Sequence, residues 1–185
     1  MDALAPHTGA LVVATPLLAD PNFARTVVLL VDHDEDGTVG VVLNRPTEIA
    51  VVAALPALTT PVCEPAVVFS GGPVAPDNAL AVAALPGHAE PTWFRRVLGD
   101  FGLIDVTALE DAVLPVSQAR LYAGYAGWSA GQLEWEIGEG AWIVVTAVPS
   151  DLYSQAPERL WRSVLRRQPG PTSYLSTWTD DPDAN

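Results

Sequence analysis

The sequence predicts a single α+β domain built on a mainly antiparallel, coiled β-sheet with a few short flanking helices. Apolar residues make up 49% of the 185 residues and charged residues only 17%, which is the balance of a folded chain with a sizeable core. The 17 prolines and 14 glycines are spread along the chain, so they indicate turns between many short elements. Strand-like and helix-like segments do not alternate regularly, and this disfavours a doubly wound parallel sheet.

The first half of the chain is predicted to consist mainly of strands. The acidic segment 32–37 separates two β-branched runs and therefore predicts a hairpin. Thr47 follows a turn at residues 44–46 and can cap a short helix that ends near Leu55. Apolar or β-branched runs predict strands over residues 11–14, 26–31, 39–43, 66–70 and 79–85.

The second half is predicted to contain both strands and helices. Residues 93–98 have the pattern of one or two helical turns, and Ser129 can cap a helix that continues to Ile137. Residues 158–167 form an amphipathic pattern with one apolar face, which predicts a helix packed on the sheet. Strands are predicted over residues 103–106, 120–125 and 142–148.

The domain boundary is expected near the end of the last helix. No linker, internal repeat or low-complexity block divides the chain before that point. The apolar periodicity disappears after Gln168, and the chain ends in an acidic segment. Residues 1–170 are therefore expected to form one domain, and residues 171–185 are expected to form a frayed tail.

The charge of the chain bears on its partners and its compartment. The nine basic residues are all arginines, and the net charge is −13, so direct binding to nucleic acid is not expected. Cys63 is the only cysteine, which favours a reducing compartment. The start of the sequence lacks the basic and apolar regions of a secretion signal, and the apolar runs are too short to span a bilayer. A cytoplasmic protein without membrane contact is the expectation.

The glycine- and tryptophan-rich segment 124–136 contains the pattern GxSxG around Ser129. In α/β-hydrolases this pattern marks a nucleophilic serine, and the catalytic histidine follows it in the chain. Here His7, His33 and His88 all precede Ser129. We therefore interpret the segment as a tight turn and a capped helix. No catalytic residue, metal ligand or cofactor is assigned from the sequence.

The acidic hairpin tip resembles the opening of a calcium loop. Asp32, Asp34, Asp36 and Gly37 follow the pattern DxDxDG. The twelfth position of such a loop supplies a bidentate carboxylate, but Leu43 occupies it here, and the flanking residues are strand-like. A solvated hairpin tip is the better interpretation.

A candidate binding site lies where the predicted helix after Ser129 begins. Gln132 and Glu136 are four residues apart and therefore share one face of that helix, and Trp128 lies on the turn before it. An aromatic ring, an amide and a carboxylate at a helix start can line a small-ligand pocket. The alternative, which the sequence does not separate from the first, is that Gln132 and Glu136 hold neighbouring backbone in place.

Two further candidates are turns that follow predicted strands. Asn44 and Arg45 follow one strand, and Gly71 and Gly72 follow another. Turns of this kind present free backbone N–H groups that can hold an anion, and Arg45 could add a bidentate donor. The alternative is ordinary turn chemistry, with Arg45 paired to a nearby carboxylate.

Several segments carry a resemblance when they are taken together, namely residues 11–16, 20–23, 40–46, 71–74, 124–128 and 131–134. With these segments the chain resembles the YqgE/AlgH family of bacterial proteins. This resemblance implies an α+β fold with a bifurcated, coiled β-sheet. It carries over no established catalytic residues, because most members are uncharacterised and some are only labelled as transcriptional regulators. In similar proteins the position of Ser129 is commonly glycine.

The favoured hypothesis is a non-catalytic regulatory module that binds a small molecule or a protein partner. An alternative is a transcriptional regulator that acts through a partner, since the sequence contains no convincing DNA-binding motif. A weaker alternative is a hydrolase that uses Ser129. The predicted binding residues are Asn44, Arg45, Gly71, Gly72, Trp128, Gln132 and Glu136.

Overall fold

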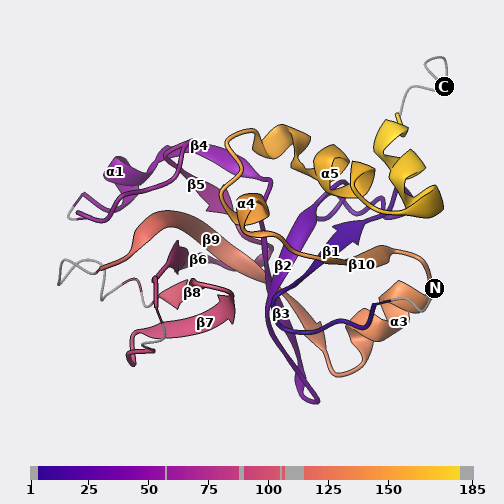
Figure 1. The fold of residues 1–185 in the computed structure, drawn as a ribbon, viewed down its shortest axis with the longest axis horizontal. Coiled ribbons are helices and arrows are strands. Elements are labelled where there is room, and N and C mark those ends of the chain that lie inside the picture. Colours follow the sequence, from indigo (N-terminus) through magenta and orange to yellow (C-terminus); the bar gives the residue numbers. More distant parts are fainter. Residues whose placement is uncertain (1–3, 57, 88–89, 105, 107–114, 180–185) are drawn as a thin grey trace.

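The computed structural model describes residues 4–56, 58–87, 90–104, 106 and 115–179 (Figure 1). The strands are β1 (Ala10–Ala14), β2 (Val27–Asp34), β3 (Gly37–Val42), β4 (Pro46–Ala50), β5 (Val67–Ser70), β6 (Val74–Ala84), β7 (Phe94–Leu98), β8 (Phe101–Ile104), β9 (Ser117–Ser129) and β10 (Trp142–Thr146). The helices are α1 (Val51–Ala54), α3 (Gln132–Gly138), α4 (Pro149–Leu152), α5 (Pro157–Arg166) and the 3-10 helix η1 (Gly170–Thr177).

The strands form one curled, mostly antiparallel sheet, which confirms the predicted α+β class. Its main path runs in the order β10-β1-β2-β3-β9-β6-β8-β7, and β4 and β5 branch from it. Of the pairings between named strands, all are antiparallel except that of β5 with β9. The predicted hairpin at residues 32–37 is confirmed, because β2 and β3 pair down to Asp34 and Gly37.

The sheet divides along β9, the long strand that crosses the middle of Figure 1. One edge of β9 pairs with β6 over most of its length. The other edge pairs first with β5 at Tyr122 and Ala123 and then with β3 from Ala126 to Ser129. Because two strands share one edge, the sheet separates there into two branches. This arrangement agrees with the bifurcated sheet that the resemblance implies.

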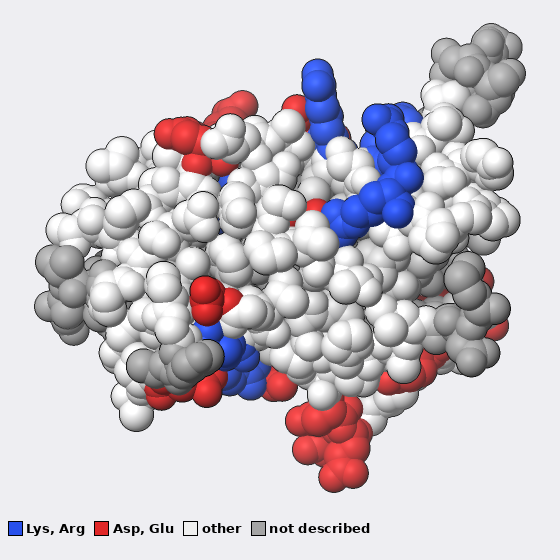
Figure 2. All heavy atoms as spheres, viewed as in Figure 1, with Lys and Arg blue, Asp and Glu red and all other residues white. Residues whose placement is uncertain are grey.

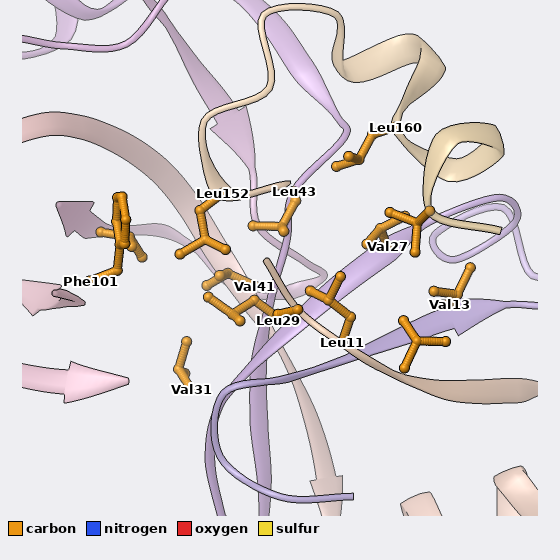
Figure 3. Packing of buried hydrophobic residues seen from close by; sticks show 14 of the residues in the cluster. Leu11, Val13, Val27, Leu29, Val31, Val41, Leu43, Phe101, Leu152 and Leu160 are labelled. Carbon is orange, nitrogen blue, oxygen red and sulfur yellow. The ribbon is translucent and has the colours of Figure 1, made fainter. Parts of the chain in front are cut away.

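One branch of the sheet contains β10, β1, β2 and β3, and one of its faces packs against α5. Strand residues at alternate positions point to this face, among them Leu11, Val13 and Leu29, and they meet Leu160 from α5 (Figure 3). Proline at the start of α5 is suited to the first helical turn. Each fully buried leucine of this kind contributes about 1.5–3 kcal/mol. This cluster is the largest apolar core.

The opposite face of the same strands packs against α3. Val12, Val28 and Leu30 point to this side and contact Leu133 of α3. Both faces of β1 and β2 are therefore buried, and this explains why their sequences are continuous apolar runs and not alternating ones. The two helices thus hold the branch from opposite sides, and α3 is fixed against the end of β9.

Residues 93–98 form a strand, so the prediction of helical turns there is wrong. Phe94 to Leu98 is β7, which pairs with β8. Gly99 and Asp100 form the turn between them, and Gly99 has a φ of +54°. A Gly-Asp pair between apolar runs is a hairpin signal, and it decides the local structure here.

Two predicted helix caps are also wrong. Thr47 lies in β4, where its hydroxyl donates to the carbonyl of Val68 at 2.6 Å, so this threonine joins β4 to β5. Ser129 is the last residue of β9, and α3 begins only at Gln132 after Gly131, whose φ is +72°. In both cases strand pairing extends beyond the boundary that the sequence pattern indicates.

The end of the described chain is more regular than the frayed tail predicted from residue 171. Residues 170–177 form η1, which packs against α5. Arg162 of α5 donates to the carbonyl of Ser176 and, at 3.0 Å, to that of Trp178. These bonds to backbone explain the order of a segment that lacks periodicity. Residues 180–185 lie outside the described part of the chain. Among the described helices, none is long and apolar enough to cross a membrane.

Candidate functional site

A hollow of about 410 Å³ opens between the loop at residues 18–23, the end of β9, α3 and the start of β10. We call it the α3 hollow. Its side walls carry carboxylates and aromatic rings, and three of the predicted binding residues lie in it. The polar and aromatic side chains that line it include Asp20, Phe23, Trp128, Gln132, Trp135, Glu136, Glu139 and Trp142.

The carboxylate of Glu136 is the centre of a hydrogen-bond network in the α3 hollow. Its Oε2 accepts from the indole Nε1 of Trp128 at 3.0 Å and from that of Trp142 at 2.7 Å. Its Oε1 accepts from the amide of Gln132 at 2.9 Å. All three donors are neutral, so they fix the position of the carboxylate without neutralising its charge.

The network extends from Gln132 to the end of β9. The Oε1 of Gln132 accepts from the backbone N–H of Ser129 at 3.0 Å and from its hydroxyl at 3.1 Å. Gln132 therefore does hold neighbouring backbone, as one of the two interpretations of the sequence stated. The same side chain also donates to Glu136, which lines the hollow.

Three aromatic rings pack together at the base of the α3 hollow. The ring of Phe23 lies 6.1 Å from that of Trp128 in a stacked orientation and 5.6 Å from that of Trp142 in an edge orientation. Trp128 and Trp142 meet edge to face at 5.7 Å. These geometries are the preferred ones for aromatic pairs and make the base rigid. Trp135 differs, because its side chain is 65% exposed at the rim.

The α3 hollow is strongly acidic. Asp20 and Glu139 are exposed and join Glu136 in its lining, and none of the described arginines or histidines lines it. Among the described residues, no basic side chain forms an ion pair with Glu136. Acidic side chains also gather at the β2–β3 tip, whereas arginines lie over α5 (Figure 2). The hollow is therefore an acidic site on an acidic molecule.

Arg45 and Gly72 line a separate hollow of about 440 Å³ that we call the Arg45 hollow. The guanidinium of Arg45 donates to the carbonyl of Ala24 at 2.7 Å and has no carboxylate partner among the residues described. Pro21 and Asn22 line it as well, so the loop at residues 18–23 contributes to both hollows. The predicted binding residues are thus neighbours, but they do not share one pocket.

Asn44 and Gly71 line neither hollow, and each has a structural contact. The Asn44 side chain accepts from the N–H of Val27 and donates to the carbonyl of Arg25, both at 2.9 Å, which ties the end of β3 to the start of β2. Gly71 lies directly on β9, where a Cβ would come within 2.2 Å of the carbonyl oxygen of Gly124. Only glycine fits at this close approach, which lies at the division of the sheet.

Ser129 is exposed, and its hydroxyl donates to Gln132 and not to a histidine. The ring of His33 contacts the Thr38 hydroxyl at 2.8 Å and the Glu134 carboxylate at 3.5 Å. The Nδ1 of His7 lies 3.0 Å from the carbonyl oxygen of Ala5. His88 lies outside the described residues.

The acidic hairpin tip has its own local partners. Asp32 forms an ion pair with Arg95 at 3.2 Å. Asp34 accepts from the backbone N–H groups of Asp36 and Gly37, which closes the turn. These contacts are those of a stabilised hairpin turn.

A second polar cluster lies near the other end of β9. Arg120 is 2% exposed and donates to the carbonyls of Glu64, Leu152 and Ser154 at 2.8, 3.3 and 3.1 Å. Its guanidinium also lies 4.5 Å from the ring centroid of Phe69. No carboxylate among the described residues pairs with it. Buried cations need such compensation by dipoles when an anion is missing.

Two titratable groups lie beside Arg120. Burial raises the pKa of the Cys63 thiol, and the Arg120 charge offsets part of that increase. Burial also raises the pKa of Tyr122 well above its ordinary value of 10, and Arg120 again opposes the shift. The Tyr122 hydroxyl and Nε of Arg120 have no hydrogen-bond partner within the described part of the chain. The Tyr122 hydroxyl and the Arg120 Nε are closed off from solvent, so these two groups belong to the core.

Most of the residues that line the α3 hollow were not predicted from the sequence. Asp20 and Phe23 lie more than a hundred residues before Trp142 in the sequence, and no local pattern connects the two segments. Trp135 had a signal, because Leu133 and Ile137 on the inner face of α3 leave it on the outer face.

The fold and the hollow together define a class: an α+β protein with a divided antiparallel sheet and an open, acidic, aromatic hollow beside its central strand. Comparison with known sequences then gives the family. A family model described as AlgH-like matches residues 11–173. A UPF0301 protein of Streptomyces coelicolor is 54% identical over 183 residues, which cover 96% of this chain and 95% of that protein. The chain belongs to the AlgH-like family.

Solved structures agree with this assignment. A crystal structure of a protein from Corynebacterium diphtheriae superposes with a TM-score of 0.88 and 32% identity, over 96% of this chain and 95% of that one. The solution structure of the AlgH protein from Pseudomonas aeruginosa gives a TM-score of 0.70 and 28% identity, over 98% and 100% of the two chains. The resemblance noted from the sequence is therefore confirmed.

Proposed function

We propose that this chain is a non-catalytic regulatory module of the cytoplasm that binds a small molecule in the α3 hollow. The observation that carries the proposal is the Glu136 carboxylate, which three neutral N–H donors hold in place at the wall of an open hollow. A polar group fixed in advance lowers the entropy cost of binding. A volume of about 410 Å³ lies within the usual range for small-ligand pockets.

Nuclear magnetic resonance with a fragment library tests the proposal directly. Each of the six tryptophans carries one indole N–H group, and a ligand in the α3 hollow is expected to shift the resonances of Trp128, Trp135 and Trp142. Trp161, which belongs to α5 on the opposite face of the sheet, serves as the internal reference. Hits that move only Trp161, or a library without hits, would contradict the proposal.

A pair of variants controls for non-specific effects. Trp135→Ala removes an exposed ring from the rim of the α3 hollow and is expected to weaken binding of a hit about tenfold. Tyr174→Ala removes a comparably exposed ring from η1, far from the hollow in sequence, and is expected to leave binding unchanged. Equal effects of the two variants would show that the hits bind elsewhere.

A role in transcription through a protein partner has a weaker basis. Ile49 and Val52 are 54% and 73% exposed next to the small apolar pocket beside α1, and exposed apolar side chains of this kind suit a protein contact. The net charge of −13 disfavours direct DNA binding. A fluorescence polarisation assay at low salt is expected to show no tight binding to duplex DNA.

Hydrolysis by Ser129 has the least support, because neither described histidine is hydrogen-bonded to it. A fluorophosphonate probe is expected to leave Ser129 unlabelled. Labelling that disappears in Ser129→Ala would favour the hydrolase instead.

A further inference from the structure

The charges and rings of the α3 hollow narrow the class of ligand. We infer that the hollow recognises a small organic cation, in which a protonated amine or quaternary ammonium group is attached to an apolar body. The inference rests on the proposed binding function. Three properties of the hollow support it: its uncompensated negative charge, its aromatic lining, and the use of its N–H donors by its own carboxylate.

The first property is the negative charge. Glu136 is held by neutral donors and has no ion-pair partner among the described residues, so its charge remains available. Asp20 and Glu139 add to it from the rim. Close to a low-dielectric wall, these charges attract a cation more strongly than they would in water. The net charge of −13 adds a long-range field of the same sign.

The second property is the aromatic lining. Phe23, Trp128 and Trp142 form a packed base, and Trp135 provides an exposed indole at the rim. The face of an indole attracts ammonium groups, especially those with methyl or alkyl substituents that also gain from leaving water. A simple metal ion would gain little from such rings, whereas an organic cation uses the rings and the carboxylates together.

The third property is the state of the hydrogen-bond donors. The indole N–H groups of Trp128 and Trp142 and the amide of Gln132 already donate to Glu136. The polar atoms left to a ligand are therefore mainly carboxylate oxygens, which are acceptors. A ligand must bring its own donors or positive charge, so an anionic ligand is disfavoured. The Arg45 hollow offers the opposite chemistry, because a guanidinium lines it.

The size of the hollow favours a free small molecule over a protein side chain as the source of the cation. Its volume of about 410 Å³ encloses a molecule larger than the end of one lysine. The exposed ring of Trp135 at the rim can contact an apolar body as well as the ammonium group. The inferred ligand is therefore a free amine, and a lysine derivative is included in the test for comparison.

A matched series of probes tests the charge requirement. Phenethylamine is protonated at neutral pH, 2-phenylethanol is its neutral counterpart, and 3-phenylpropionate is its anionic counterpart. Indole N–H shifts are expected to give an affinity for phenethylammonium at least about tenfold higher than for the alcohol, and no binding of the propionate. The affinity for the amine is expected to fall as the salt concentration rises, because screening weakens charge attraction.

Two glutamates on α3 provide matched variants. Glu136→Gln keeps the shape of the side chain and removes its charge, and it is expected to weaken phenethylammonium binding about tenfold or more. Glu134→Gln makes the same change on the same helix, at a carboxylate that contacts His33 outside the hollow lining, and it is expected to leave the affinity within about twofold. Because Glu139 is exposed, Glu139→Gln provides a second charge variant that does not depend on the internal network.

Each outcome decides a separate point. Equal binding of phenethylammonium and 2-phenylethanol would overturn the cation inference and leave the binding function standing. Binding of none of the three probes would also overturn the inference, while hits from the fragment library at the same indoles would still support the binding function. Tighter binding of Nα-acetyl-lysine amide than of phenethylammonium would contradict the choice of a free amine as the source of the cation.

Discussion

The two ends of β9 each lie beside a charge that neutral groups stabilise. At one end, the Arg120 guanidinium donates to three backbone carbonyls and lies against the Phe69 ring. At the other end, the Glu136 carboxylate accepts from two indoles and one amide. Neither charge has an ion-pair partner among the described residues. The two ends therefore use the same electrostatic arrangement with opposite sign.

They differ in the space around the charge. Arg120 is closed in by the segments at residues 62–64 and 152–154 and is 2% exposed, so its arrangement can only stabilise the fold. Glu136 faces a hollow of about 410 Å³. A charge held by dipoles becomes a binding group when there is space for a ligand beside it. Charge and free volume together therefore determine whether such a group can bind a ligand.

Replacement of Arg120 is expected to have the largest effect on stability. Arg120→Met fills similar space but leaves three carbonyls without a donor, and it is expected to lower the free energy of unfolding by about 4 kcal/mol. Urea unfolding followed by circular dichroism measures this change. Arg159→Met, at a position whose side chain is 81% exposed, is the control and is expected to change stability by less than about 0.5 kcal/mol. If Arg120→Met left the free energy of unfolding unchanged, the buried guanidinium would not be needed for stability.

A substitution between the two ends tests whether β9 must be held at the division of the sheet. In Gly72→Ala a Cβ would approach the carbonyl carbon of Tyr125 to 2.2 Å, and the φ of +149° disfavours alanine. The expected loss is about 3 kcal/mol of unfolding free energy. Gly138→Ala, at the end of α3 with open space around it, is the matched control and is expected to be neutral or slightly stabilising. Similar results for both would argue against the close approach.

Removal of one donor from Glu136 is expected to have a smaller effect. Trp142→Phe keeps most of a buried ring and removes the N–H that donates at 2.7 Å, so the expected loss is about 2 kcal/mol. Trp135→Phe, at an exposed indole without a bond to Glu136, is expected to change stability by less than about 0.5 kcal/mol. Chemical denaturation of both variants provides the test. Equal losses of unfolding free energy would show that the hydrogen bond from Trp142 to Glu136 does not stabilise the fold.

The smallest effect at neutral pH is expected for Tyr122→Phe, because the buried hydroxyl has no partner among the described residues. Above pH 10 the unfolding free energies of Tyr122→Phe and of the unsubstituted chain are expected to diverge. Burial raises the Tyr122 pKa, so the unfolded chain loses this proton first while the folded chain keeps it. Stability therefore falls as pH rises, by about 1.4 kcal/mol per pH unit for one group.

The pH dependence separates Tyr122 from the other tyrosines. Tyr122→Phe is expected to reduce the alkaline slope of the unfolding free energy, and Tyr174→Phe, at a 76% exposed position, is expected to preserve it. Part of the slope remains in either variant, because burial also raises the Cys63 pKa. An unchanged slope in Tyr122→Phe would mean that the phenol is not closed off at this end of β9.

Much of the fold could be predicted because its elements are local patterns. Continuous apolar runs gave β1, β2 and β10, and the spacing of Gln132 and Glu136 placed both on one face of α3. The hairpin at Gly99 was missed although its Gly-Asp signal is local. The partnership of Trp142 with Glu136 could not be predicted, since it depends on how β10 returns beside β1. The pairing of β10 with β1 brings Trp142 to the α3 hollow, and this pairing cannot be read from the types of the residues alone.

The position of β9 also has a consequence for how the chain folds. Its partners β3, β5 and β6 all precede it, so their edges stay unpaired until residues 117–129 leave the ribosome. Long-range pairing of this kind slows folding, because loops must close before contacts form. Exposed strand edges in that interval favour association with other chains. Refolding yield is therefore expected to fall as protein concentration rises, and a chain truncated before residue 117 is expected to aggregate.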